Sequence, residues 1–181
     1  FLREGSAIDD TFNPDRIVIG EYDERSGDVL QSFYLDFHKS KAPRIIRMNL
    51  ASAEMVKYAS NAFLATKISF INQIANICEK IAGVDVTGVA DAMGLDERIG
   101  RKFLDAGAGF GGSCFGKDLR ALISFSNQLC YEPNLLEAVL DVNEKQAVHI
   151  VESARHHLGD LREKRIAILG LSFKPNTDDI R

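Results

Sequence analysis

"SAEMVKYASNAFLATKISFINQIANICEKIAG" (52–83) is the segment that decides the organisation of this chain. Ser52 is a candidate N-cap, Gly83 is a stop signal, and apolar residues recur between them at helical spacing. The pattern predicts one helix of about 30 residues, which would be about 45 Å long. Because such a helix is longer than a small domain is wide, we expect it to pack against a second copy of the chain or to bridge two domains.

Before this helix, the sequence alternates between strand and helix patterns. "DRIVIG" (15–20) and "PRIIRM" (43–48) are short apolar runs, and "SGDVLQSFYLDFHKS" (26–40) has helical spacing, with Ser26 or Asp28 as its cap. A strand, a helix and a strand with short links predict a βαβ unit. The unit is too small to be a sheet domain alone, so we expect it to be the end of one.

After the long helix, the spacing predicts four more helices, at 85–94, 96–106, 117–129 and 134–159. "KRIAILGLSFKPNTDDIR" (164–181) then predicts the first strand of a doubly wound nucleotide-binding sheet, although only Gly170 of a G-x-G-x-x-G is present. The fold class expected is mixed α/β and mainly helical, with a helical middle between the ends of two α/β domains. The boundaries expected are 1–48, 49–132, 133–160 and 161–181.

The composition narrows the classes of protein and partner. The chain has 181 residues, 45% of them hydrophobic, and a net charge of −4. Mild acidity gives no reason to expect nucleic acid or an anionic membrane as a partner, and no stretch reaches the roughly 20 apolar residues of a membrane helix. The chain opens on "FLREG" without an initiator methionine, so we expect it to be part of a longer protein.

Three cysteines at unrelated spacings form neither a disulfide framework nor a zinc pattern, so we expect no metal and a reducing, cytoplasmic compartment. Cys114 stands apart because it follows the glycine-rich loop of "GAGFGGSCFGKD" (107–118) and precedes a helix. A helix N-terminus and the nearby Lys117 would favour a thiolate. The alternative, that Cys114 is a small buried residue after a flexible loop, stays open on spacing alone. We expect Cys78 to lie in the core and Cys130 to be inert.

Lys57 and Asn61 are a second candidate pair, because residues four apart share a face of a helix. With Glu54 they place polar groups on a rather apolar helix. A lysine and an amide directed at one point can bind an oxyanion or a hydroxyl. The pattern alone favours the simpler interpretation of a solvated face.

Four separated segments together resemble the UDP-glucose/GDP-mannose dehydrogenase family: "FLREGSAIDDTFNPDRIVIG" near the start, "EMVKYASNAFLATKISFINQIANIC" in the middle, "GFGGSCFGKD" and, at the end, "KRIAILGLSFKPNTDDIR". The resemblance implies an NAD-dependent enzyme that oxidises the C6 alcohol of a nucleotide sugar twice, to a carboxylate. It also implies two Rossmann-like domains joined by a long helix that forms a homodimer. Residues 1–48 would end the NAD-binding domain, 49–132 would be the central dimerisation and catalytic domain, 133–160 a connecting helix, and 161–181 the start of the nucleotide-sugar domain.

The resemblance also assigns roles. Cys114 would attack the C6 aldehyde to form a thiohemiacetal, and a second hydride loss would give a thioester that water hydrolyses. Lys57 and Asn61 match the pair that stabilises the oxyanion and positions water, and Asp118 matches a carboxylate that assists proton transfer. The substrate contacts it implies are Phe1, Leu2, Arg3, Glu4, Arg98, Phe103, Gly109, Phe110, Gly111, Gly112 and Lys174, with Arg98 reaching the neighbouring subunit's substrate. The cofactor side would be formed by Glu4, Cys114, Lys117 and Arg181.

The resemblance leaves the substrate open between UDP-glucose, which the motifs favour, GDP-mannose and a UDP-N-acetylhexosamine. Gly116 stands where the family commonly has proline, so the turn after the thiol is expected to be looser. Two other classes compete: a dimerisation module without catalysis, and a one-step hydroxyacid dehydrogenase. Cys114 separates the second of these, because a one-step alcohol oxidation needs no nucleophile.

Overall fold

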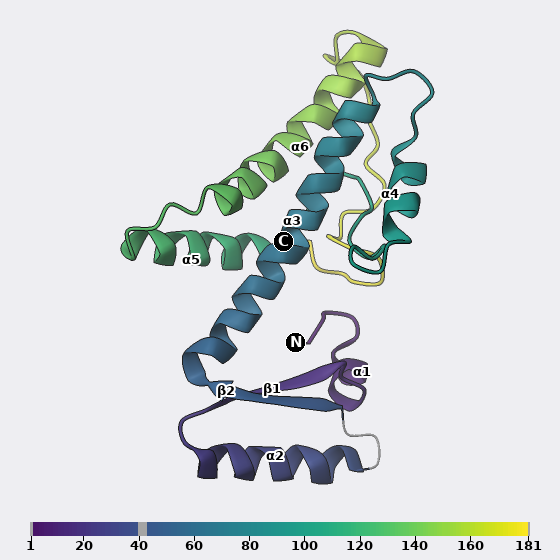
Figure 1. Cartoon of the computed structure of the whole chain (residues 1–181). Coiled ribbons are helices and arrows are strands. Elements are labelled where there is room, and N and C mark those ends of the chain that lie inside the picture. Colours follow the sequence, from purple (N-terminus) through teal and green to yellow (C-terminus); the bar gives the residue numbers. More distant parts are fainter. Residues whose placement is uncertain (1, 40–42, 181) are drawn as a thin grey trace. The chain divides into compact units, whose positions relative to one another are not determined.

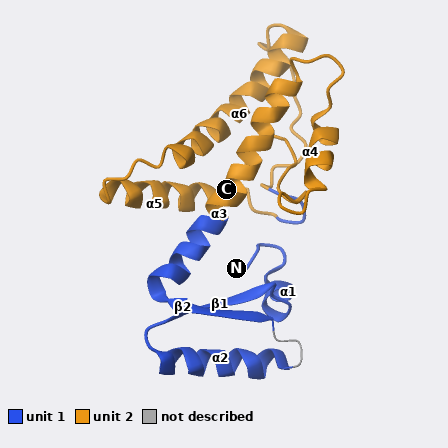
Figure 2. Cartoon of the chain, in the orientation of Figure 1, with its two compact units in different colours: residues 1–60, 174–177 blue, residues 61–173, 178–181 orange. Residues whose placement is uncertain are grey.

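The computed structural model describes residues 2–39 and 43–180 (Figure 1). The chain divides into two compact units. Unit 1 comprises residues 1–60 with 174–177, and unit 2 comprises residues 61–173 with 178–181 (Figure 2).

Unit 1 contains the βαβ arrangement that the sequence predicts. Its elements are α1 (Ala7–Phe12), β1 (Arg16–Glu21), α2 (Glu24–His38) and β2 (Arg44–Asn49). The two strands are parallel, with Ile17 opposite Ile45 and Ile19 opposite Arg47. Ile17 and Ile19 point from β1 into the core of the unit. Because parallel strands need a crossover, α2 supplies the connection between them.

The N-terminus of α2 differs from the expectation. Asp23 is the cap, and not Ser26 or Asp28. The Ser26 N–H donates to the Asp23 carboxylate at 2.7 Å, and the Asp23 N–H donates to the Ser26 hydroxyl at 3.1 Å. This reciprocal pair satisfies two backbone donors at the helix start, so the helix begins at Glu24.

The long helix is α3 (Leu50–Cys78), with 29 residues. It begins two residues earlier than predicted, because the Ser52 N–H donates to the Asn49 side-chain oxygen at 2.8 Å and Asn49 is therefore the capping residue. It also ends five residues earlier than Gly83. The N–H groups of Lys80 and Ile81 donate to carbonyls three residues back, which tightens the chain into turns.

Unit 2 is built on the second half of α3, with α4 (Val86–Gly94), α5 (Phe115–Gln128) and α6 (Asn134–Leu158). Two side-chain bonds join α3 to α6, Ser69 to the Val139 carbonyl at 2.9 Å and Asn76 to Gln146 at 3.1 Å, and a third joins His149 of α6 to Glu79, just after α3, at 2.8 Å. The partner numbers rise together, so the two helices run side by side in the same direction (Figure 1).

Two small apolar clusters form the core of unit 2. The first joins α3, α5 and α6 through Ala62, Ala65, Leu119 and Val139. The second joins α3, α4 and the following loop through Ile71, Ala90 and Leu104. The first cluster lies directly under the start of α5, and it therefore supports the residues around Cys114.

Two predicted elements are absent from the described residues. The segment 96–106 forms turns rather than a helix, because Gly100 and Phe103 have φ of 67° each and Lys67 binds the carbonyls of Ile99 and Gly100 at 2.9 and 3.0 Å. The expected strand at 164–170 is not formed either. A strand needs a neighbour to satisfy its backbone groups, and within its unit the described residues contain no other strand.

Within residues 2–39 and 43–180, no helix is both long and apolar enough to span a membrane. The same residues contain no group of three or more histidine, cysteine, aspartate or glutamate side chains arranged to hold a metal ion.

Candidate active site around Cys114

Cys114 occupies the N-cap position of α5, and its side chain makes no capping hydrogen bond. Its thiol is exposed, and the sulfur lies 3.7 Å from the Ser113 hydroxyl. The first N–H groups of a helix have no intrahelical partner, and Cys114 directly precedes those of α5. Exposure argues against the alternative of a buried, purely structural cysteine, which is instead the situation of Cys78.

Asp118 lies one turn after Cys114 on α5, and its N–H donates to the Cys114 carbonyl at 2.9 Å. Its side chain is only 5% exposed, and both carboxylate oxygens have donors. The Asn61 amide donates to one oxygen at 2.6 Å, and the Lys117 ammonium pairs with the other at 2.6 Å. A buried carboxylate requires such partners. The fold therefore brings together Asn61, Lys117 and Asp118, three of the residues singled out from the sequence, one helical turn after Cys114.

Lys57 is the remaining member of the predicted catalytic set. It lies on α3, one turn before Asn61, so the two side chains leave the helix on the same face. Lys57 belongs to unit 1 and Asn61 to unit 2. Its role at the reacting carbon stays a prediction.

The glycine loop before Cys114 is held by an asparagine of α6. The Phe110 N–H donates to the Asn143 side-chain oxygen at 2.7 Å, and the Asn143 amide donates back to the Phe110 carbonyl at 3.1 Å. Gly109 has φ of 100°, and a Cβ there would lie 2.5 Å from the same Asn143 oxygen. Glycine is therefore required at 109 by the conformation and by the approach of Asn143.

The start of the loop is held in the same way by two further amides. The Gly107 N–H donates to the side-chain oxygen of Asn72 at 2.7 Å, and the Gln146 amide donates to the Gly107 carbonyl at 3.0 Å. Asn76 in turn donates to the Gln146 side-chain oxygen at 3.1 Å. The loop is therefore fixed to α3 on one side and to α6 on the other.

Sequence reasoning missed Asn72, Asn143 and Gln146. The signal that points to Asn72 is its place inside the apolar stripe of the long helix, where a polar residue needs a partner. Asn72 is fully buried and Gln146 is 5% exposed, which rules out the usual solvent-facing role of an amide.

Aromatic rings surround the residue that follows the thiol. The Phe115 ring lies 5.9 Å from that of Phe110 and 6.3 Å from that of Phe103, centroid to centroid. Gly112 has φ of 77°, and a Cβ there would lie 2.8 Å from the Phe173 ring. The side chains of Asn143 and Phe173 thus occupy the space left by Gly109 and Gly112. The expected role of these glycines, and of Gly111, in approaching a sugar stays a prediction.

The other predicted contact residues lie at the start of the chain, in the turns after α4 and near the end of the chain. Arg3 pairs with the buried Asp10, and hydrogen bonds from its guanidinium and from its backbone N–H hold the pKa of that carboxyl well below its usual range. Arg98 pairs with Asp96 at 2.6 Å, which lowers the pKa of Asp96. Leu2 and Glu4 are exposed, and the Lys174 carbonyl accepts from the Thr177 hydroxyl at 2.8 Å. The positions of Phe1 and Arg181 fall outside the described residues.

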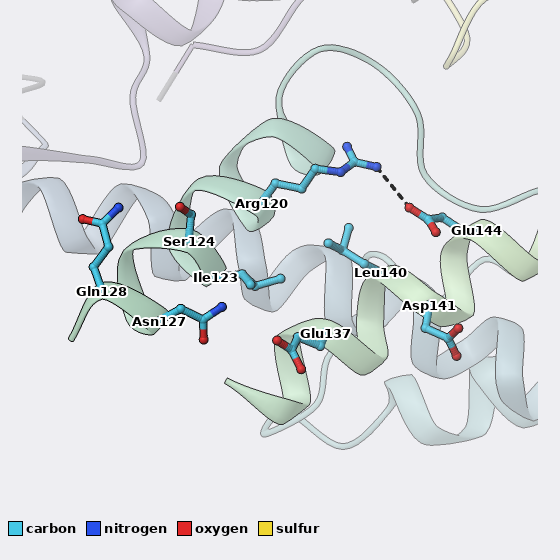
Figure 3. Close-up of a pocket in the computed structure, with 9 residues that line it drawn as sticks. All are labelled: Arg120, Ile123, Ser124, Asn127, Gln128, Glu137, Leu140, Asp141 and Glu144. Atoms are coloured by element: carbon cyan, nitrogen blue, oxygen red, sulfur yellow. Dashed lines mark hydrogen bonds and ion pairs between the residues drawn. The ribbon is translucent and has the colours of Figure 1, made fainter. Parts of the chain in front are cut away.

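An open groove of about 770 Å³ lies between α5 and α6 (Figure 3). Arg120 reaches across it to Glu144 at 3.2 Å. Its lining is polar along both helices, with Ile123 and Leu140 at its centre, and it contains none of the predicted site residues.

Unit 1 thus supplies a βαβ arrangement, and unit 2 presents an exposed thiol one turn before a buried carboxylate. Residues 51–145 match the central domain of the UDP-glucose/GDP-mannose dehydrogenase family, and residues 1–38 match the NAD-binding domain of the same family. The chain belongs to this family.

Individual relatives agree with the family assignment. The chain is 56% identical over its full length to the UDP-glucose 6-dehydrogenase TuaD of Bacillus subtilis and covers 38% of that protein. A solved UDP-glucose dehydrogenase from Pyrobaculum islandicum superposes on the whole chain with a TM-score of 0.92 at 50% identity, over 41% of its own length. A UDP-D-ManNAc dehydrogenase from Pyrococcus horikoshii superposes on the whole chain with a TM-score of 0.83 at 26% identity, over 42% of its own length. The chain thus spans about two fifths of these relatives.

Proposed function

We propose that this chain is part of a longer NAD-dependent nucleotide-sugar 6-dehydrogenase that oxidises UDP-glucose at C6 twice, to the uronate. The observation that carries the proposal is the exposed thiol of Cys114 at the start of α5, one turn before the buried Asn61–Asp118 pair. The name of the Bacillus subtilis relative, a UDP-glucose 6-dehydrogenase, supports the choice of substrate.

The residues present fit part of a dinucleotide site. Parallel strands joined by a helix are the repeating unit of a Rossmann sheet, and ligands bind outside the carboxyl ends of such strands, where Glu21 and Asn49 lie. Glu4, Lys117 and Cys114, with Arg181, are proposed to face the cofactor. NAD⁺, when bound, accepts one hydride in each of the two oxidations.

In the proposed mechanism, Cys114 traps the aldehyde left by the first oxidation. The thiolate adds to C6, a C–S bond forms, and the carbonyl oxygen takes up a proton to give a thiohemiacetal. Loss of the second hydride leaves a thioester, water adds to its carbonyl, and the C–S bond breaks to release the carboxylate and the thiolate. Lys57 and Asn61 would donate hydrogen bonds to the oxyanion formed at each addition, and Asp118 would move protons to and from that oxygen and the attacking water.

We propose that the substrate contacts are those the family resemblance implies, from the strip 1–4 to Lys174, with Arg98 reaching the partner subunit's site. GDP-mannose and a UDP-N-acetylhexosamine are the alternative substrates. The domain boundaries at 48, 132 and 160 belong to the same proposal, as does a cytoplasmic location, which the free thiols of Cys114 and Cys130 support.

A second function of the chain itself is homodimerisation through α3. Phe63, Phe70 and Ile77 are spaced seven residues apart and are 65%, 44% and 50% exposed, so they form one apolar stripe along the helix. A seven-residue apolar repeat is typical of a helix that packs along a second helix. Light scattering on the purified chain should give twice the monomer mass, and a monomer at micromolar concentration would rule this out.

The stoichiometry of cofactor reduction tests the enzymatic proposal. The full-length protein is supplied with NAD⁺ and, in parallel, with UDP-glucose, GDP-mannose or UDP-N-acetylmannosamine, and NADH is counted per sugar consumed. Two NADH per UDP-glucose is the expected result. One NADH per sugar would refute the double oxidation, and two NADH only with another sugar would change the substrate.

A further inference from the structure

Three amide side chains hold the backbone of the loop that leads to Cys114, and we name Asn72, Asn143 and Gln146 the amide clamp. They make four hydrogen bonds of 2.7–3.1 Å to the N–H and C=O groups of Gly107 and Phe110. Each of these two loop residues therefore has both of its backbone polar groups bonded to the clamp. Glycine-rich loops are otherwise the most mobile parts of a chain.

The clamp comes from two different helices, and this makes the loop position dependent on the helical core. Asn72 lies on α3, whereas Asn143 and Gln146 lie one turn apart on α6. Asn76 of α3 also donates to Gln146, so the two helices are joined beside the loop. The parallel packing of α3 against α6 thus sets where the loop backbone can lie.

The position of the loop constrains the position of the thiol in two ways. Along the chain, Phe110 precedes Cys114 by four residues. Through space, the Phe110 ring packs edge to face on Phe115, the residue directly after Cys114, at 5.9 Å. Both rings also pack on the cluster of Ala62, Ala65, Leu119 and Val139. The thiol is thus fixed from both of its flanks once Phe110 is held.

We propose that the amide clamp positions the Cys114 thiol for capture of the aldehyde, and that Asn143 is its principal positioning residue; the proposal rests on the double oxidation given above. Asn143 is principal because its one amide engages both polar groups of Phe110. It also occupies the space that Gly109 leaves, so the loop sequence and the clamp fit each other.

The proposal predicts a specific defect. The first hydride transfer needs no thiol, so a displaced Cys114 leaves the formation of aldehyde intact. Addition of the thiolate to C6 then becomes slow, and free aldehyde dissociates before the C–S bond forms. The ratio of released aldehyde to NADH therefore rises. A variant that is merely less stable lowers the amount of active enzyme and leaves that ratio unchanged.

The test compares Asn143→Leu with Asn143→Asp in the full-length protein. Leucine removes both hydrogen bonds at similar volume, whereas aspartate keeps the acceptor for the Phe110 N–H and loses the donor to the Phe110 carbonyl. The control is Asn127→Leu, an exposed asparagine of α5. Amide hydrogen exchange is followed in the peptide that covers residues 105–114, and released aldehyde is captured with a hydrazide and counted against NADH.

We expect exchange in this peptide to rise at least about tenfold in Asn143→Leu, which loses two hydrogen bonds, and less in Asn143→Asp, which loses one. Captured aldehyde per NADH should rise in the same order, and the control should match the wild type in both measurements. Unchanged exchange in Asn143→Leu would overturn the clamp. Faster exchange without added aldehyde would overturn its role in capture. If the wild type reduces no NAD⁺ with any nucleotide sugar, the proposed function fails, while the exchange result still decides whether the clamp holds the loop.

Discussion

Substitutions in the buried pair of Asn61 and Asp118 should distinguish the contribution of this pair to stability from its role in catalysis. Asn61→Leu removes the donor that lies 2.6 Å from the Asp118 carboxylate. Loss of a hydrogen bond to a charged buried group costs about 1.5–3 kcal/mol. For a chain of this length that corresponds to a fall in melting temperature of about 3–12 °C.

Asn61→Asp perturbs the same pair through charge. Two carboxyl groups would then face each other, and one of them must bind a proton, which raises its pKa above the unfolded value. The folded state then holds more protons than the unfolded state, so this variant loses stability as the pH rises above about 4. Urea unfolding at pH 5 and pH 8 measures the difference.

The exchanged variant, Asn61→Asp with Asp118→Asn, restores an amide opposite a carboxylate. We expect it to regain most of the stability that Asn61→Asp loses, because the hydrogen bond reforms with donor and acceptor reversed. Turnover should stay low, since the carboxylate then sits on α3 rather than one turn after Cys114. Stability losses that simply add in the exchanged variant would refute the direct pair, and full turnover would refute the role of Asp118.

Other predictions concern acid sensitivity, the helix start and the dimer. The Arg3–Asp10 pair depresses the folded pKa of Asp10 below 3.8, so its contribution to stability is present above that pH and is lost as the pH falls below it. Asp10→Asn should therefore make the unfolding free energy less dependent on pH between about pH 4 and 2, and an unchanged dependence would contradict the pairing. Gly116 lies in the first turn of α5, and a Cβ there meets only the end of the flexible Arg120 side chain at 3.1 Å. Gly116→Ala should therefore stabilise the protein by about 0.5–1 kcal/mol and raise its melting temperature. A lower melting temperature would show that the turn needs glycine. Phe70→Glu should convert the dimer to a monomer in light scattering, and a persistent dimer would place the interface elsewhere.

The regular elements follow from local sequence where caps and periodicity agree. The helix predicted at 85–94 is α4, and it begins after Asp85, whose carboxylate accepts the Thr87 N–H at 3.0 Å. The segment 134–159 is α6 with an error of one residue at its end. The βαβ unit could also be predicted from the sequence, because its strands and its helix are separated by turn residues.

The failures share a physical cause, which is that distant groups decide the outcome. The segment 96–106 has helical spacing, yet Lys67 from α3 binds carbonyls that a helix would use internally. The strand pattern at 164–170 depends on a neighbouring strand for its hydrogen bonds, and local sequence cannot supply one.

In the candidate site, too, local features could be predicted from the sequence and contacts between distant residues could not. Cys114 was identifiable from its loop and from the helix that follows, and the exposed thiol agrees with that interpretation. The family resemblance named Asn61 and Asp118 separately, but their pairing, which spans 57 residues, was not predicted. The amide clamp could not be predicted, since polar residues on a long helix give no indication of which loop they meet.

The covalent role of Cys114 is the central claim, and one measurement addresses it directly. Full-length wild type and Cys114→Ala are given limiting UDP-glucose with excess NAD⁺, and both NADH and the uronate are counted per sugar consumed. The account predicts two NADH and one uronate per sugar for the wild type, and aldehyde without uronate for Cys114→Ala. Two NADH and a full yield of uronate from Cys114→Ala would contradict it, because the second oxidation would then proceed without the thiol.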